Sequence, residues 1–220
     1  MDSSKWPARA SLPVAQPGLK FIITAILLTG LLFYFGWTGF ACFSFGITVF
    51  VVWFFRDPER IPPEGDKNLI SPADGKVIVI DKLKGCDYLA GPCIKVSIFM
   101  NVFNVHVNRM PFDGEIEKVL YHPGKFMNAS FDKASTHNER NTLVVRTASN
   151  ERFAVVQIAG LIARRIVNCA KVGDVLSKGD RYGMIQFGSR LDLYLPADFN
   201  VTVQMGEKTI AGSTIIGVMK

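Results

Sequence analysis

The chain has 220 residues, which is ample for one globular unit with an attached segment and short for two large domains. Hydrophobic residues make up 49% of it and charged residues only 20%, a composition that excludes a disordered or fibrous protein. The net charge of +6 is a mild basic bias, suited to anionic lipid surfaces. Because the chain has no arginine-rich stripe interleaved with aromatic residues, we expect no nucleic-acid partner.

The first segments of the chain predict a tail followed by a membrane-associated hairpin. Residues 1–20 contain three prolines and read as a tethering tail, whereas residues 21–55 contain no Asp, Glu, Lys, Arg or His. As one helix, this apolar run would be about 52 Å long, well beyond a hydrocarbon core of ~30 Å. Gly36-Trp37-Thr38-Gly39 interrupts it. We therefore predict two helices, and both a spanning hairpin and a shallow re-entrant pair stay open.

Positive residues flank the apolar run on both sides. Three precede it and two follow it: Lys5, Arg9 and Lys20, then Arg56 and Arg60. Positive charge favours the cytoplasmic side, so both ends of the hairpin are expected there. This predicts the cytoplasmic (inner) membrane, with the rest of the chain facing the cytoplasm. Two core helices of a soluble protein are the ordinary alternative.

Residues 56–68 are rich in proline and charge, which is typical of an interface linker and places the domain boundary here. From residue 69 to residue 220, short β-branched segments alternate with Gly, Asn, Asp and Pro clusters, which predicts a mainly β, barrel- or sandwich-like domain. Residues 128–139 and parts of 160–171 look irregular or weakly helical. The expected strands cover residues 76–80, 94–100, 102–107, 142–146, 153–158, 192–195 and 201–205.

The four cysteines form no CxxC pair, so neither a disulfide framework nor a zinc site follows from their spacing: Cys42, Cys86, Cys93 and Cys169. We expect no metal, and we expect the cysteines to pack as small hydrophobic residues. Rossmann glycine, Walker, HExxH and GxSxG motifs are also absent from the sequence.

A small-residue turn near the C-terminus carries a specific chemical liability. Glycine allows strained backbone angles, which leave the Gly212 carbonyl open to attack by the Ser213 hydroxyl. The ester so formed can undergo β-elimination to dehydroalanine, which hydrolyses to a pyruvoyl group. An ordinary β-turn is the simpler interpretation of this pair taken alone, and a second pair, Gly188-Ser189, shows how common the dipeptide is.

Several further motifs occur with this turn in a fixed order. They are Ser71-Pro72-Ala73-Asp74-Gly75, Asn104-Val105-His106-Val107-Asn108-Arg109-Met110-Pro111, Tyr121-His122-Pro123-Gly124-Lys125-Phe126, Asn138-Glu139-Arg140-Asn141, Gln157-Ile158-Ala159-Gly160, Gly183-Met184-Ile185-Gln186-Phe187-Gly188-Ser189-Arg190 and Gly212-Ser213-Thr214. Together they resemble the phosphatidylserine decarboxylase proenzymes from about Phe54 to the C-terminus. The length of the chain resembles the short prokaryotic form.

The resemblance implies a pyruvoyl-dependent lyase that cleaves itself between Gly212 and Ser213. The products are a β chain of residues 1–212 and an α chain of residues 213–220, whose covalent pyruvoyl cofactor derives from Ser213. The implied reaction converts phosphatidylserine in an anionic membrane to phosphatidylethanolamine and CO2. Loss of CO2 from an amino acid leaves a carbanion that needs a carbonyl as electron sink, and we find no phosphate cradle for pyridoxal phosphate. The sequence leaves a homo-oligomer open.

The resemblance also implies an Asp-His-Ser triad for cleavage. Asp74 matches the family acid, although an aspartate at a turn is also ordinary. Some members carry two histidines three residues apart, whereas this chain has His106 and then Arg109. We favour His106 over His122 and His137, with a buried structural histidine as the plainer alternative.

Three arginines are candidate ligands for phosphate or carboxylate, although solvated surface arginine is the more ordinary interpretation: Arg164, Arg165 and Arg190. Three alternatives to the implied function stay open. They are a decarboxylase of another serine-headed lipid, a decarboxylase of a soluble amino acid, and a non-catalytic membrane-tethered β module.

Overall fold

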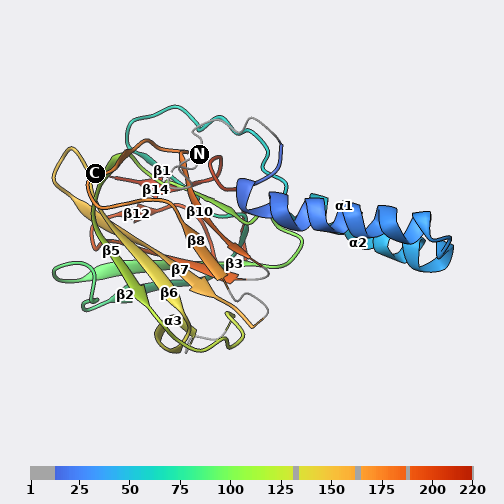
Figure 1. Ribbon diagram of the computed structural model, residues 1–220. Helices are drawn as coiled ribbons and strands as arrows, with labels where there is room; N and C mark the ends of the chain where they lie inside the picture. The colour runs from blue at the N-terminus through green and yellow to red at the C-terminus, as the bar shows by residue number, and fades with distance from the viewer. Residues whose placement is uncertain (1–12, 131–133, 162–164, 187–188, 220) are drawn as a thin grey trace. The chain divides into compact units, whose positions relative to one another are not determined.

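The computed structural model describes residues 13–130, 134–161, 165–186 and 189–219. The chain separates into two compact units between Glu59 and Arg60. The first is helical and the second is β-rich (Figure 1).

The helical unit is a hairpin. A short 3-10 turn, η1 (Gln16–Gly18), leads into α1 (Leu19–Tyr34), and α2 (Thr38–Phe54) follows after a three-residue break. Gly36 has a φ of +73°, a left-handed conformation that glycine adopts without strain. The break between the two helices therefore lies at the predicted position, around Gly36.

Hydroxyl groups hold the two helices of the hairpin together. The Oγ1 atom of Thr29 on α1 lies 2.7 Å from Oγ of Ser44 and 2.9 Å from Oγ1 of Thr48, both on α2. All three side chains are buried in the hairpin. Such hydrogen bonds between small polar residues are typical of helix contacts inside membranes, where no water competes for them.

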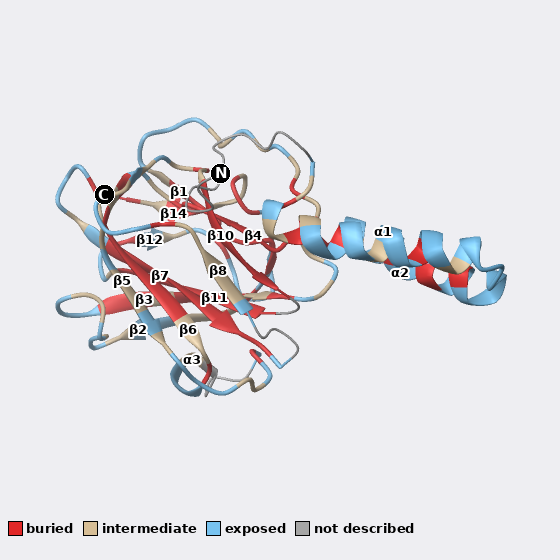
Figure 2. Ribbon diagram, in the orientation of Figure 1, coloured by how far each residue is buried: buried red, intermediate tan, exposed pale blue. Residues whose placement is uncertain are grey.

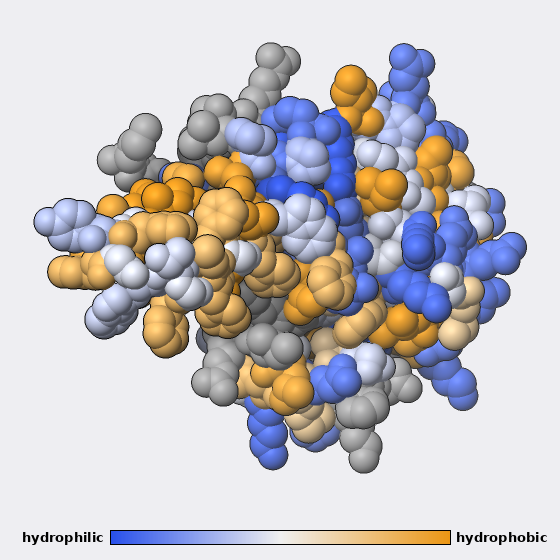
Figure 3. Space-filling view, turned by 90° about the vertical axis from the view of Figure 1, so that its right-hand side faces the viewer, coloured by the Kyte–Doolittle hydropathy of each residue, from blue (hydrophilic) through white to orange (hydrophobic). Residues whose placement is uncertain are grey.

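The outer surface of the hairpin is apolar. Large hydrophobic side chains of both helices are exposed, as the pale blue helices of Figure 2 and the orange side chains of Figure 3 show; among them are Leu27, Phe33, Phe40, Phe43 and Val49. Residues 16–34 are long and apolar enough to cross a membrane, and Thr38–Phe54 is somewhat shorter. Exposed apolar surface of this extent is costly in water, so the hairpin is a candidate membrane segment.

The β-rich unit contains an eight-stranded antiparallel sheet in the order β13-β2-β3-β11-β7-β6-β5-β9. Register shifts between Val77 and Val79 and between Ile116 and Lys118 are β-bulges, which bend strands and let the sheet curl. Its strands are β2 (Gly75–Leu83), β3 (Cys93–Met100), β5 (Gly114–His122), β6 (Arg140–Arg146), β7 (Arg152–Ala159), β9 (Val175–Leu176), β11 (Ser189–Pro196) and β13 (Lys208–Thr209).

Two three-stranded sheets complete the unit. One has the order β1-β14-β12, from β1 (Asn68–Ile70), β14 (Ile215–Val218) and β12 (Asn200–Val201); the other has the order β4-β10-β8, from β4 (Val107–Arg109), β10 (Arg181–Gln186) and β8 (Arg165–Asn168). The main core joins all three sheets, because Ile98 and Leu193 of the large sheet share one buried cluster with Ile216 and Ile185 of the small ones. The predicted mainly β, barrel- or sandwich-like fold is confirmed.

The other face of the large sheet carries a buried charged cluster. Arg190 on β11 donates from Nε to Oδ1 of Asp192 at 2.6 Å and from Nη2 to Oγ of Ser97 at 2.8 Å. Lys95 and Ser135 reach the second oxygen of Asp192, at 3.5 and 3.2 Å. Ser135 belongs to the single-turn helix α3 (Ala134–His137), so the cluster fastens α3 to the sheet.

Two predicted strands differ from the structure, and some strands of the structure were not predicted. Residues 102–106 precede β4 without forming a strand, because the Asn101 side chain accepts from the backbone N–H of Phe103 and the Asn104 side chain accepts from that of Asn101. Of the predicted strand at 201–205, only Val201 lies in a strand, in which it follows Asn200, since a turn around Gly206 comes next. The nine-residue strand β5 was not predicted.

Candidate active site

The Gly212-Ser213 bond lies in a tight turn between β13 and β14. The backbone N–H groups of Ser213 and Thr214 both donate to the carbonyl of Ile210, at 3.1 and 3.0 Å. Gly212 is buried and has a φ of +77°, whereas Ser213 is partly exposed. The backbone at this bond is therefore in the conformation that glycine tolerates best.

A second turn supports the first. The carbonyl of Ser71 accepts from the N–H of Gly212 at 2.8 Å, and the N–H of Ser71 donates to the carbonyl of Thr214 at 2.7 Å. One hydrogen bond thus lies on each side of the bond between residues 212 and 213. The Ser71-Pro72-Ala73-Asp74 motif is brought directly against the Gly-Ser turn.

Asp74 is connected to the turn through Ala211. Its Oδ1 atom accepts from the N–H of Ala211 at 2.8 Å, and the whole residue is 9% exposed. Arg60 makes the main charged contact with it, since Nη1 bonds Oδ1 and Nη2 bonds Oδ2, the latter at 2.9 Å. The carboxylate is thus held in one orientation one residue away from Gly212.

Arg109 lies against Gly212. A Cβ atom built on Gly212 would lie 2.9 Å from Cδ of Arg109, closer than carbon atoms normally approach. Arg109 is 4% exposed, and its Nη1 atom donates to the carbonyl of Gly179 at 3.0 Å. The residue that replaces the second family histidine is therefore a neighbour of the proposed cleavage bond.

The three histidines have different surroundings. His106 is completely buried just before β4, and its carbonyl accepts from the N–H of Ile185 at 3.4 Å. His122 ends β5 and is half-buried, while His137 is exposed in α3, 2.9 Å from Oγ1 of Thr136. The burial of His106 agrees equally with a structural histidine, and its part in cleavage stays a prediction.

The candidate anion-binding arginines also differ in how deeply they are buried. Arg190 is completely buried in the cluster with Asp192, so the interpretation as a solvated surface arginine is wrong for it. Arg165 begins β8 and is exposed. Arg164 lies outside the described residues.

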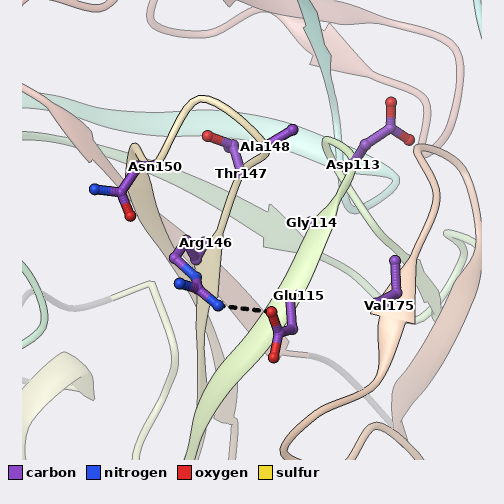
Figure 4. Close-up of a pocket in the computed structure, with 8 residues that line it drawn as sticks. All are labelled: Asp113, Gly114, Glu115, Arg146, Thr147, Ala148, Asn150 and Val175. Carbon is purple, nitrogen blue, oxygen red and sulfur yellow. Dashed lines mark hydrogen bonds and ion pairs between the residues drawn. The ribbon is translucent and has the colours of Figure 1, made fainter.

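A separate hollow of about 370 Å³ opens between β5, β9 and the turn after β6 (Figure 4). Its one ion pair joins Arg146 to Glu115 at 2.7 Å, and both side chains are at least 40% exposed. Its lining includes neither Asp74 nor any residue of the Gly-Ser turn, so we assign it no part in the chemistry.

Residues 47–217 match the family model described as phosphatidylserine decarboxylase, which places the chain among the decarboxylases, a class of lyases. Three relatives are named phosphatidylserine decarboxylase proenzyme. That of Syntrophus aciditrophicus (strain SB) is 49% identical over 93% of this chain and 96% of its own length. That of Solidesulfovibrio magneticus is 52% identical over 92% of this chain and 94% of its own length. That of Geotalea uraniireducens is 46% identical over 94% of this chain and 97% of its own length. The chain belongs to the phosphatidylserine decarboxylase family.

Sequence reasoning singled out Asp74, Gly212 and Ser213 as candidates and gave Arg60 no role in the site. Arg60 stands in the segment interpreted as an interface linker, 14 residues before Asp74 and 151 before Ala211. The sequence around Arg60, a cation between two prolines, does not indicate that its side chain binds Asp74 and the carbonyl of Ala211. The only available signal was that Asp74 would need a cation if buried.

Proposed function

We propose that the chain is a precursor that cleaves itself between Gly212 and Ser213, and that the product converts phosphatidylserine to phosphatidylethanolamine and CO2. Membership of the family and the names of the relatives support the reaction. The word proenzyme in those names supports the precursor. The proposed reaction makes the chain an enzyme of phospholipid synthesis rather than a tethered binding module.

The proposed cleavage uses only the chain and water. The Ser213 hydroxyl attacks the Gly212 carbonyl, the C–N bond breaks, and the acyl group moves from nitrogen to oxygen. β-Elimination then expels the Gly212 carboxylate and leaves dehydroalanine at position 213. Tautomerisation and hydrolysis release ammonia and leave the pyruvoyl group. Asp74 and His106 are proposed to orient and accept the proton of the hydroxyl.

The residues around the bond fit a pyruvoyl group at position 213. Its precursor is a serine in a turn anchored on both sides, so the new chain end stays where it is made. When formed, the group supplies a carbonyl that accepts the electron pair left by departing CO2. The chain's own contribution is to hold residue 213 in place, through the hydrogen bond from the N–H of Ser71 to the carbonyl of Thr214, and to shield it partly from water.

The observation that carries the proposal is the positive φ of Gly212 in a turn tied to a buried carboxylate. Mass spectrometry of the protein purified from membranes tests it. We expect a fragment of residues 213–220 with a blocked, borohydride-reducible N-terminus, and an intact chain in the Ser213→Ala variant. Ser189→Ala alters the other Gly-Ser pair and should cleave normally. An intact wild-type chain with full activity would exclude self-cleavage.

The substrate needs a separate assay. Release of CO2 from phosphatidylserine in mixed vesicles is compared with release from free serine and from a serine-headed lipid with a different backbone. We expect turnover of phosphatidylserine at the highest kcat/KM. Preference for free serine would favour a soluble amino-acid decarboxylase, for which an apolar hairpin has no evident use.

We also propose that the hairpin holds the enzyme in the cytoplasmic membrane, with the β-rich unit in the cytoplasm. The apolar outer surface of α1 and α2 and the flanking Lys20 and Arg56 support this. The protein should stay with membranes through high salt and alkaline carbonate and dissolve only in detergent. Release by salt alone would show a peripheral, electrostatic attachment. Cross-linking in detergent tests for a homo-oligomer.

A further inference from the structure

Arg60 joins three parts of the candidate site. Its Nη1 and Nη2 atoms bind the two oxygens of Asp74, and Nη1 also donates to the carbonyl of Ala211 at 2.7 Å. The side chains of Arg60 and Asp74 are only 11% and 12% exposed. A two-point contact between guanidinium and carboxylate fixes the distance and the plane of both groups, and a partly desolvated pair is screened little by water.

The carbonyl bound by Arg60 belongs to the peptide group directly before the proposed cleavage bond. The N–H of that same peptide group, on Gly212, donates to the carbonyl of Ser71. Because a peptide group is planar, fixing its oxygen and its hydrogen fixes the whole group. The orientation of the Gly212 carbonyl then depends only on rotation within Gly212 itself.

We propose that Arg60 is a positioning residue for self-cleavage, an inference that rests on the proposed function. Arg60 acts through Asp74 and Ala211, by holding the carboxylate and the preceding peptide group in register with the attacked carbonyl. Attack by Ser213 needs the hydroxyl and the carbonyl carbon in a narrow range of distance and angle. Displacement by about 1 Å can lower the rate of such a step by ~100-fold.

The proposal gives the segment after the hairpin a role in maturation. Arg60 is only six residues beyond the end of α2, yet its side chain completes the turn at the opposite end of the sequence. Cleavage would therefore begin only after this segment has folded onto the β-rich unit. A positive charge alone does not meet the requirement, because three hydrogen bonds leave the guanidinium in fixed directions.

The test follows cleavage of full-length chains in membranes after a pulse of synthesis. Arg60→Gln should slow the appearance of the 213–220 fragment by ~10- to 100-fold. Arg60→Lys keeps the charge without the two-point contact and should also be slow. Arg146 is a partly exposed arginine of the same unit that also pairs with a carboxylate, that of Glu115. The Arg146→Gln variant should therefore cleave at the wild-type rate.

Guanidinium chloride at concentrations far below denaturing levels separates positioning from loss of fold. Added guanidinium should restore part of the cleavage in Arg60→Gln, whereas equal sodium chloride should not, and neither should change Arg146→Gln. Wild-type cleavage rates in folded Arg60→Gln or Arg60→Lys would overturn the proposal, as would a slow variant that guanidinium does not rescue. Cleavage of Ser213→Ala at this site would instead overturn the proposed function.

Discussion

At the scale of single residues, Gly212 carries two separate constraints. Its φ of +77° is unfavourable for any residue with a Cβ atom, and that atom would also press on Cδ of Arg109. In a Ser213→Ala background, which is expected to keep the chain in one piece, Gly212→Ala should therefore lower the free energy of unfolding by more than the ~1–2 kcal/mol of backbone strain alone. Urea unfolding in detergent measures this.

A second glycine provides the control for that comparison. Gly173 has a φ of +87° and open space around its missing side chain. Gly173→Ala should show the backbone strain without the crowding, so the difference between the two variants reports the contact with Arg109. Equal losses would mean that Arg109 moves aside without cost.

Cys93 makes a second prediction at this scale. Burial, and then a hydrogen bond with Cys86, raise the pKa of the Cys93 thiol to about 12. Since the thiolate is the reactive form, Cys93 should resist alkylation at mildly alkaline pH. Half-buried Cys86 should be labelled before Cys93, as peptide mass spectrometry after brief iodoacetamide treatment would show. Equal labelling of both cysteines in the folded protein would contradict the stated burial.

From the sequence, the candidate site could be predicted only where its residues lie together in short contiguous motifs. Gly212-Ser213 and the turn ending at Asp74 are short motifs that were interpreted through their resemblance to the family, because each taken alone is also an ordinary turn. Arg60 could not be recognised, because its meaning depends on a contact across 151 residues. Arg109 was visible as a departure from the family pattern, but only the fold places it beside Gly212.

At the scale of elements, loss of one partner from the buried charged cluster under α3 should be strongly destabilising. Asp192 and Arg190 are both completely buried, so Asp192→Ala would leave a buried guanidinium without its carboxylate. We expect a loss of about 3–5 kcal/mol in the free energy of unfolding. Glu115→Gln breaks an exposed pair and should cost less than ~1 kcal/mol. Similar urea midpoints for both variants would show that water reaches the cluster.

Strands β3 and β7 were predicted well because most of their residues are apolar or β-branched. Burial on both faces was not sufficient, because β10 is buried along its whole length and was not among the predicted strands. Strand β5 was missed because Glu115, Glu117 and Lys118 interrupt its apolar residues, and it lies near the edge of the sheet. The predicted strand at 102–107 was wrong because asparagine side chains capture the backbone groups that a strand would use.

At the scale of the whole molecule, cleavage would leave its short product inside the fold. Residues 213–220 include β14, which is the central strand between β1 and β12. Ile216 lies in the main core, and its carbonyl accepts from the N–H of Thr202 at 2.9 Å. Breaking one bond at the turn removes none of these contacts.

The eight-residue product should therefore remain bound to the larger chain. We expect both to elute together in gel filtration in detergent and to separate only in denaturant, because a central strand cannot leave without opening its sheet. Ile216→Ala, which removes about 2–5 kcal/mol of core packing, should make the fragment dissociate measurably. Ile215 is only partly buried, so the fragment should dissociate less from the Ile215→Ala variant than from the Ile216→Ala variant. Loss of the wild-type fragment under native conditions would mean that the cleaved molecule rearranges and that β14 is no longer its middle strand.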